Sequence, residues 1–88
     1  MTEDRLCLDG NALAALLLET FGTDMTTAVR GCHSCGQRRA LGSHRAYQGA
    51  GVVLRCPACD DLAMSIASLP DRHVVRFAGA WTLEVPRV

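Results

Sequence analysis

Aromatic residues, lysine and long apolar runs are scarce or missing in this sequence. Only 5% of its 88 residues are aromatic, and all nine basic residues are arginine, a usage typical of GC-rich bacterial genomes. The longest apolar run, residues 12–18, holds seven residues, whereas a membrane-spanning helix needs about 18. The first residues include Glu3 and Asp4, although a secretory signal peptide would start basic. We therefore expect a cytoplasmic protein with no membrane span.

Recognised catalytic patterns are missing as well. The sequence has no Ser–His–Asp signature, no glycine-rich phosphate loop and no His-Glu-x-x-His motif. Asp60 and Asp61 are adjacent carboxylates, but neighbouring acids beside a cysteine pair are more typical of a turn or a helix start than of a catalytic pair. We therefore expect that the chain is not an enzyme.

What is present indicates a folded domain. With 49% hydrophobic and 20% charged residues, the chain is too apolar to stay disordered. Its length predicts a single domain over residues 1–88, and domains of this size gain only marginal stability from their core. Disulfides or a metal ion often supply the remainder.

A helix is predicted over residues 9–22. Asp9 is a good N-cap because its carboxylate can accept hydrogen bonds from first-turn amides, and Gly22 fits the left-handed residue that ends a helix. Leu18 and Ala14 fall outside the expected buried stripe and would leave an apolar flank exposed. The stripe has the spacing of one helix face and comprises Leu13, Leu16, Leu17 and Phe21.

The remaining sequence favours β structure, so the predicted fold class is α+β. Two strands at 40–47 and 52–56 flank the turn 48–51, whose two glycines permit a tight reversal. Apolar and polar residues alternate over 62–67 as in a half-buried strand, although a helical period also fits there. Alternation on both sides of a short Ala-Gly-Ala turn predicts a final hairpin over 71–86.

Four cysteines form two pairs with the spacing of a metal site. Cys32 and Cys35 make the first pair, Cys56 and Cys59 the second, and twenty residues separate the pairs. Such spacing is typical of a tetrahedral metal ion held by two turns. Four thiolates make a closed, structural site, and one zinc ion is the expected occupant, with iron less favoured. Two disulfides or four buried thiols are the alternatives, but a reducing cytoplasm disfavours disulfides.

The residues around the pairs support this interpretation. Gly36 follows the first pair and Asp60 the second, and both residue types tolerate the left-handed backbone that such a turn needs. The two cysteine turns resemble the knuckles of zinc ribbons and rubredoxin-like proteins, and residues 54–59 look like a typical second knuckle. The ribbon would span residues 30–69.

A narrower resemblance extends over residues 8–85. The segments 9–14, 21–22 and 24–26, together with the paired cysteines, resemble a family of short actinobacterial proteins known as a domain of unknown function with a zinc-ribbon appearance. The resemblance implies a small metal-stapled α+β domain, in which an N-terminal helix accompanies zinc-ribbon β-hairpins. It also implies an accessory role beside flavin- or molybdenum-dependent oxidoreductases.

The fifth cysteine and the three histidines have simpler interpretations. Cys7 is predicted to be a small buried hydrophobe that takes no part in metal binding. His33 and His44 lie near the knuckles and are expected at the surface, since four cysteines already complete a ligand set. His73 begins a strand and has no partner in the sequence, so it is also expected at the surface.

The charges are distributed unevenly. Residues 25–59 contain five arginines and no acid, although the net charge of the whole chain is zero. A basic segment can contact nucleic-acid phosphates, but aromatic residues for base stacking are limited there to Tyr47. Arginines near a tetrathiolate also screen its negative charge through N–H···S contacts, and this is the favoured interpretation. The five are Arg30, Arg38, Arg39, Arg45 and Arg55.

The sequence thus predicts a structural zinc ribbon that serves as a protein-interaction or accessory module. A partner protein or a second copy would dock on the Leu18 flank of the helix. A nucleic-acid-binding or transcription-linked ribbon is the alternative function. A rubredoxin-like iron electron carrier is a further one.

Overall fold

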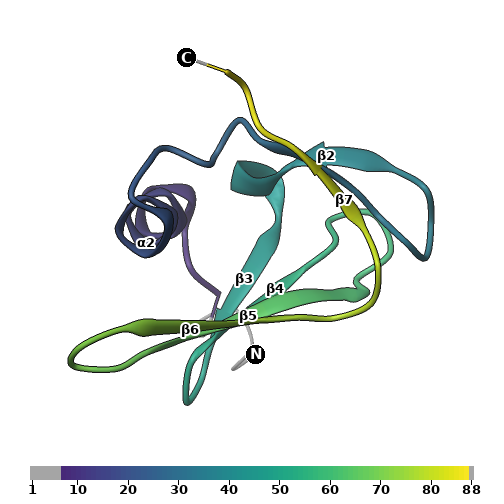
Figure 1. Cartoon of the computed structure of the whole chain (residues 1–88). Helices are drawn as coiled ribbons and strands as arrows, with labels where there is room; N and C mark the ends of the chain where they lie inside the picture. Colours follow the sequence, from purple (N-terminus) through teal and green to yellow (C-terminus); the bar gives the residue numbers. More distant parts are fainter. Residues whose placement is uncertain (1–6, 88) are drawn as a thin grey trace.

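In the computed structural model, which describes residues 7–87, an α-helix accompanies two small antiparallel sheets (Figure 1). The fold class is therefore α+β, as predicted. The larger sheet has the strand order β3-β4-β5-β6 and the smaller one the order β2-β1-β7. The bounds are α2 Gly10–Phe21, β1 Val29–Gly31, β2 Arg38–Ala40, the 3-10 turn η1 Leu41–Ser43, β3 Arg45–Gln48, β4 Val52–Arg55, β5 Leu62–Ser68, β6 His73–Phe77 and β7 Thr82–Glu84.

Helix α2 has the ends and the buried face that its sequence predicts. The Asp9 carboxylate accepts a hydrogen bond from the Ala12 amide at 2.8 Å, and Gly22 ends the helix with a φ of 76°. Leu13 and Leu17 are buried, and Leu16 and Phe21 pack against the core from its edge. Outside this face, the side chain of Leu18 is 51% exposed. Ala14, the other residue expected on the outer flank, is half-buried.

The hairpin between the cysteine pairs is present, but its first strand is shorter than predicted. Strands β3 and β4 pair from Arg45↔Arg55 to Gln48↔Val52. The predicted strand 40–47 is instead divided, because the chain turns through η1 between the two sheets. This turn buries Leu41 completely beneath α2, and the Leu41 amide donates to the Ala28 carbonyl at 2.8 Å. Burial of one leucine thus outweighs the continuation of a strand.

Residues 62–67, whose apolar pattern fits either a strand or a helix, form a strand. Strand β5 runs over Leu62–Ser68 and lies between β4 and β6, where it pairs on both edges. Its apolar residues Met64 and Ile66 point into the core and are buried. Two neighbouring strands decide in favour of β structure, since each adds a ladder of backbone hydrogen bonds.

The predicted C-terminal hairpin 71–86 is wrong. Strand β6 pairs with β5, whereas β7 pairs with β1 in the other sheet, so residues 78–81 connect the two sheets (Figure 1). Strand β6 instead forms a hairpin with the preceding strand β5, and β7 has a partner that is remote in sequence. Val75 lies opposite Ile66, and the Trp81 indole donates to the Ala63 carbonyl at 3.1 Å.

The apolar core lies between α2, η1 and the four-stranded sheet. The strands of the smaller sheet add no buried apolar residue to it; their one buried side chain is Arg30. The smaller sheet is therefore weakly anchored by apolar packing. The core comprises Leu13, Leu17, Met25, Ala28, Leu41, Ala46, Leu54, Ala63, Met64 and Ile66.

Candidate metal centre

The first cysteine pair lies in the turn that joins β1 to β2. The Cys32 amide donates to the Gln37 carbonyl at 2.9 Å, and the Gly36 amide donates back to the Cys32 carbonyl at 3.1 Å. Gly36 has a φ of 76°, as its position predicts. Because the turn is closed at both ends, the side chains of Cys32 and Cys35 are held on one side of it.

The second pair repeats this geometry between β4 and β5. The Cys56 amide donates to the Asp61 carbonyl and the Asp60 amide to the Cys56 carbonyl, both at 2.9 Å. Asp60 has a φ of 67° and is the one residue other than glycine with a positive φ among residues 7–87. The first knuckle thus belongs to the smaller sheet and the second to the larger sheet. A hydrogen bond of 2.5 Å from the Ser34 hydroxyl to the Asp61 carboxylate also joins them.

The four sulfurs of the knuckles converge on one point. The Sγ atoms of Cys32 and Cys59 are 3.7 Å apart, those of Cys35 and Cys56 are 3.8 Å apart, and all four lie within 4.8 Å of one another. A metal ion with four sulfurs at about 2.3 Å has sulfurs about 3.8 Å apart. None of the cysteines forms a disulfide. The residues present therefore fit a tetrahedrally coordinated metal ion.

The inner and outer ligands differ in their surroundings. Cys32 and Cys56 are buried, whereas Cys35 and Cys59 are exposed. The amide of Ala58 donates to the sulfur of Cys56 at 3.4 Å. Such amide donors compensate negative charge on a thiolate and make it a better ligand.

Cys32 and Cys59 have pKa values that are shifted in opposite directions. The backbone amide of Cys35, helped by that of Ser34, lowers the pKa of Cys32 to about 6 against the effect of burial. For Cys59 the Asp61 amide lowers the pKa, but desolvation and the three other thiols together raise it by more. The resulting pKa of Cys59 is about 12. A bound cation would displace the proton on Cys59, because a coordinating thiol is deprotonated.

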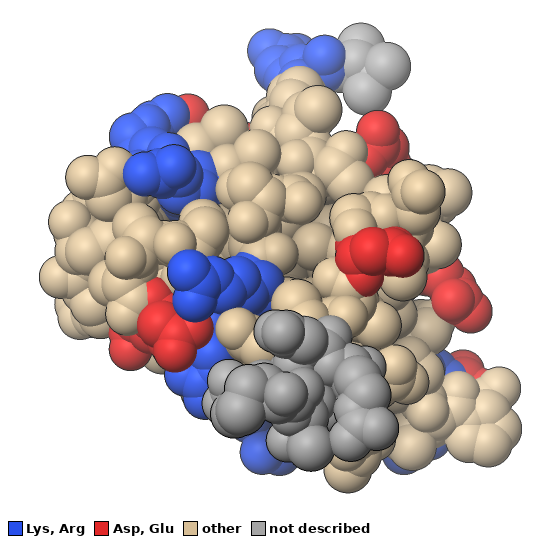
Figure 2. Space-filling model, turned by 180° about the vertical axis from the view of Figure 1, so that it is seen from behind, with Lys and Arg blue, Asp and Glu red and all other residues tan. Residues whose placement is uncertain are grey.

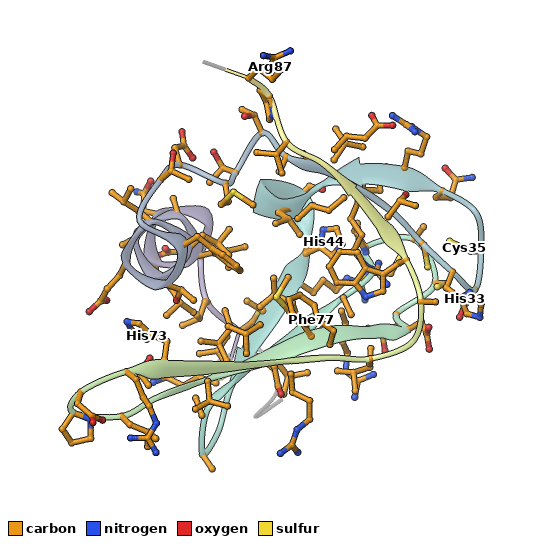
Figure 3. The ribbon with its side chains drawn as sticks, viewed as in Figure 1. His33, Cys35, His44, His73, Phe77 and Arg87 are labelled. Atoms are coloured by element: carbon orange, nitrogen blue, oxygen red, sulfur yellow. The ribbon has the colours of Figure 1, made fainter. Side chains whose placement is uncertain are left out.

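Of the three histidines, which were all expected at the surface, His33 and His73 lie at or near it and His44 does not (Figure 3). His33 is exposed beside Cys35 at the knuckles, and His73 is half-buried, with its Nδ1 atom 2.8 Å from the Ser68 hydroxyl. The prediction of a surface His44 is wrong, because this side chain is only 5% exposed. It lies between the two sheets, where its Nδ1 atom is 3.0 Å from the Ala40 carbonyl. Burial, the main cause, and the charge of Arg30 lower its pKa.

The prediction of a buried Cys7 is also wrong. Its side chain is exposed, and its backbone forms an isolated bridge with Tyr47 at the outer edge of β3. The residue lies outside the four-sulfur cluster. Burial of a lone cysteine depends on how the N-terminal segment meets the sheet, which the sequence around it does not specify.

The five arginines expected to surround the centre have different environments. Arg38 pairs with Glu84, Arg45 lies 3.7 Å from Asp60, and the Arg55 guanidinium donates to the Asp60 carbonyl at 3.0 Å. Arg39 is exposed. In the view from behind, acidic side chains lie next to several arginines, so positive charge does not dominate this face (Figure 2). Arg30 differs from the others because it is 1% exposed.

Burial of Arg30 was missed by sequence reasoning. An arginine in a basic segment is expected at the surface, since charged groups are seldom buried without a partner. One signal was available, because Arg30 and Cys32 are two residues apart and strand residues at this spacing share a face. A buried ligand at one position therefore places the other near the interior.

These features define a class of protein: a small α+β domain in which two knuckles bring four cysteines together. The family model described as "Family of unknown function (DUF6510)" matches residues 2–88. The chain belongs to this family, in agreement with the expected domain of unknown function. The searches of curated proteins and of solved structures found no match. Over the described residues, 7–87, no helix has the length and apolar character to cross a membrane.

Proposed function

We propose that this protein is a zinc ribbon whose one zinc ion, bound by Cys32, Cys35, Cys56 and Cys59, holds two sheets together. The observation that carries the proposal is the spacing of the four sulfurs, which matches the edges of a tetrahedron around an ion. Four thiolates leave no open position, so the ion has a structural role. Catalytic zinc, by contrast, keeps one position for water or substrate.

Zinc is favoured over iron because the cluster resembles other closed tetrathiolate sites, which hold zinc in most ribbons. A rubredoxin-like electron carrier with iron in the same cluster is the runner-up. The two differ in colour, since a ferric tetrathiolate absorbs visible light and zinc, with a filled d shell, does not.

The proposed role is that of an accessory module that presents a surface to another protein. Support comes from helix α2, whose Leu18 side chain is 51% exposed beside the packed face of the helix. Phe77 on β6 is also 55% exposed. Apolar surface that a small domain does not bury is a common mark of a docking site.

A nucleic-acid role receives less support from the arrangement of the arginines. Of the five in residues 25–59, Arg30 is buried and Arg38 and Arg45 face acidic side chains. Binding to phosphates needs cations that are free to replace counterions. We therefore place this function behind the interaction module.

The experiment that tests the proposal is metal analysis by mass spectrometry on protein purified without added metal. The expected result is one zinc per chain, and less metal in Cys35→Ser and Cys59→Ser variants. Cys7→Ser is the matched control, because it makes the same chemical change at an exposed cysteine outside the cluster, and it should keep full zinc content.

Structural zinc contributes about 10–16 kcal/mol of apparent binding free energy, which is comparable to or larger than the whole stability of a small domain. The knuckle variants should therefore also lose the dispersed amide signals of residues near the site. A metal-free wild-type protein with an unchanged, dispersed spectrum would contradict the proposal. Iron in place of zinc would favour the electron carrier.

A further inference from the structure

The side chain of Arg30 is a buried cation with incomplete pairing. It lies on β1, is 1% exposed, and has its Nη1 atom 3.4 Å from Nε2 of His44. The carbon at the centre of its guanidinium is 4.8 Å from the centroid of the Trp81 ring. The Nε and Nη2 atoms are buried and have no hydrogen-bond partner within the described residues. A buried charge in such a setting is costly unless another charge compensates it.

No carboxylate provides that compensation in the described part of the chain. The ion pairs over residues 7–87 are those of Arg38, Arg45 and Arg72. His44 adds no negative charge, because it accepts from Arg30 at Nε2 and holds its proton on Nδ1, beside the Ala40 carbonyl. The contact with Trp81 is a cation–π interaction, which is worth only about 0.5–2 kcal/mol.

The four-cysteine cluster is the source of negative charge at the end of the same strand. Arg30 lies in β1, Cys32 directly follows the last residue of that strand, and both side chains are buried. Trp81, which covers the guanidinium, is held by a 3.1 Å hydrogen bond from its indole to the Ala63 carbonyl. Ala63 is the second residue of β5, the strand that leaves the second knuckle. Arg30 is thus connected to the first knuckle through β1, and its Trp81 contact is connected to the second knuckle through β5.

We propose that Arg30 is the buried counter-ion of the metal centre. The inference rests on the proposed function, because a divalent ion with four thiolates carries a net charge of −2. Arg30 and the two inner ligands, Cys32 and Cys56, are buried, so water screens the attraction between the cation and this side of the centre less than at the surface. The negative charge of the metal-bound centre balances the guanidinium, and the guanidinium in turn stabilises that negative charge. His44 and Trp81 hold the cation in place without neutralising it.

The exposed arginines cannot do the same, because water and salt screen their charges. Arg39 makes the best control, since it pairs with Arg30 across the β1–β2 ladder but is exposed. The test compares Arg30→Met, Arg30→Lys and Arg39→Met. Zinc affinity is measured for each by competition with a chromophoric chelator, after the fold of the zinc-loaded protein has been checked by circular dichroism.

Removal of an outer partner of a metal site commonly lowers affinity by about 10–100-fold. Arg30→Met should therefore bind zinc at least about tenfold more weakly, whereas Arg39→Met should stay within about twofold of wild type. Arg30→Lys keeps the charge and should lie close to wild type. If Arg30→Lys loses as much affinity as Arg30→Met, or if neither loses any, the proposal is overturned.

A second readout separates charge from packing. In protein loaded with iron in place of zinc, reduction adds negative charge to the centre, so a nearby cation favours the reduced form. Arg30→Met should lower the reduction potential, while Arg30→Lys and Arg39→Met should leave it near the wild-type value. An unchanged potential in Arg30→Met would overturn the inference. Wild-type protein that binds neither metal would instead refute the proposed function itself.

Discussion

The residue that follows each cysteine pair shows how local chemistry shapes this molecule. Gly36 and Asp60 occupy equivalent positions in the two knuckles, with φ values of 76° and 67°. Both were identifiable in the sequence, because few residue types adopt this backbone without strain. The four cysteines were identifiable for a similar reason, since the Cys-x-x-Cys turn is determined by neighbouring residues alone.

His44 illustrates the opposite case, because one of its two hydrogen-bond partners, Arg30, is fourteen residues away in the sequence. Its environment leads to a dependence of stability on pH. Burial lowers the pKa of His44 from its ordinary value of 6.5, so the unfolded chain takes up a proton at higher pH than the folded chain does. The contribution of His44 to the free energy of unfolding should thus be complete above about pH 6.5. It should be lost as the pH falls through the lower folded pKa.

The measurement is the ring-carbon chemical shift of His44, followed by NMR from pH 5 to 8. The expected result is a titration midpoint below the ordinary value of 6.5, with the proton of the neutral ring on Nδ1. A His44→Gln variant keeps one donor and one acceptor and serves as the control, because its denaturation midpoint should fall less than that of wild type between pH 7 and pH 5.5. A ring that is protonated at pH 6.5 would contradict the expectation.

Helix α2 is the element whose structure could be predicted best from the sequence. Its two ends and its buried face follow from the N-cap, the final glycine and the leucine spacing, all of which lie within the helix or next to it. The strands were less predictable. Alternation identifies β6 and β7 as strands, but the choice of partner depends on residues up to 55 positions away, as in the pair Val29↔Glu84. The short turn between them wrongly favoured a hairpin.

The outer face of α2 provides the test for the proposed docking surface. Leu17 is fully buried and the neighbouring Leu18 is 51% exposed, so the same substitution at the two positions separates folding from association. Leu17→Glu should destabilise the fold by several kcal/mol, because it places an unpaired charge in the core. Leu18→Glu should leave the thermal midpoint nearly unchanged.

Sedimentation of wild type and Leu18→Glu over a dilution series shows whether Leu18 takes part in self-association. Under the docking proposal, wild type forms a dimer or a complex that Leu18→Glu disrupts. A wild type that is monomeric at every concentration, and that binds no partner through this face, would contradict the proposal. Strong destabilisation by Leu18→Glu would show that the face packs internally.

Over the whole molecule, the two sheets differ in how they are stabilised. The larger sheet shares an apolar core with α2, whereas the strands of the smaller one contribute a single buried side chain, that of Arg30. The smaller sheet is joined to the larger one by the cysteine cluster, by the Ser34–Asp61 hydrogen bond and by the Trp81 indole. The smaller sheet should therefore remain folded only while the metal ion is bound.

Removal of the ion with a chelator should affect the sheets unequally. Amide hydrogen exchange in β1, β2 and β7 should become much faster, while the inner strands β4 and β5 retain part of their protection, because their apolar contacts remain. Exchange measured by mass spectrometry or NMR before and after chelation gives the comparison. Equal acceleration in both sheets would show that the molecule unfolds as one unit, and no change would show that the ion has no structural role.

The pairing of β1 with β7 has a consequence for the order in which the chain folds. Gly31 pairs with Thr82, so the smaller sheet closes a loop of about fifty residues and is completed only when the last strand is available. An ion shared by residues 32–35 and 56–59 would shorten this loop by roughly half. Each halving lowers the entropic cost of closure by about 0.6 kcal/mol. Early binding of the metal ion would thus accelerate the pairing of β1 with β7.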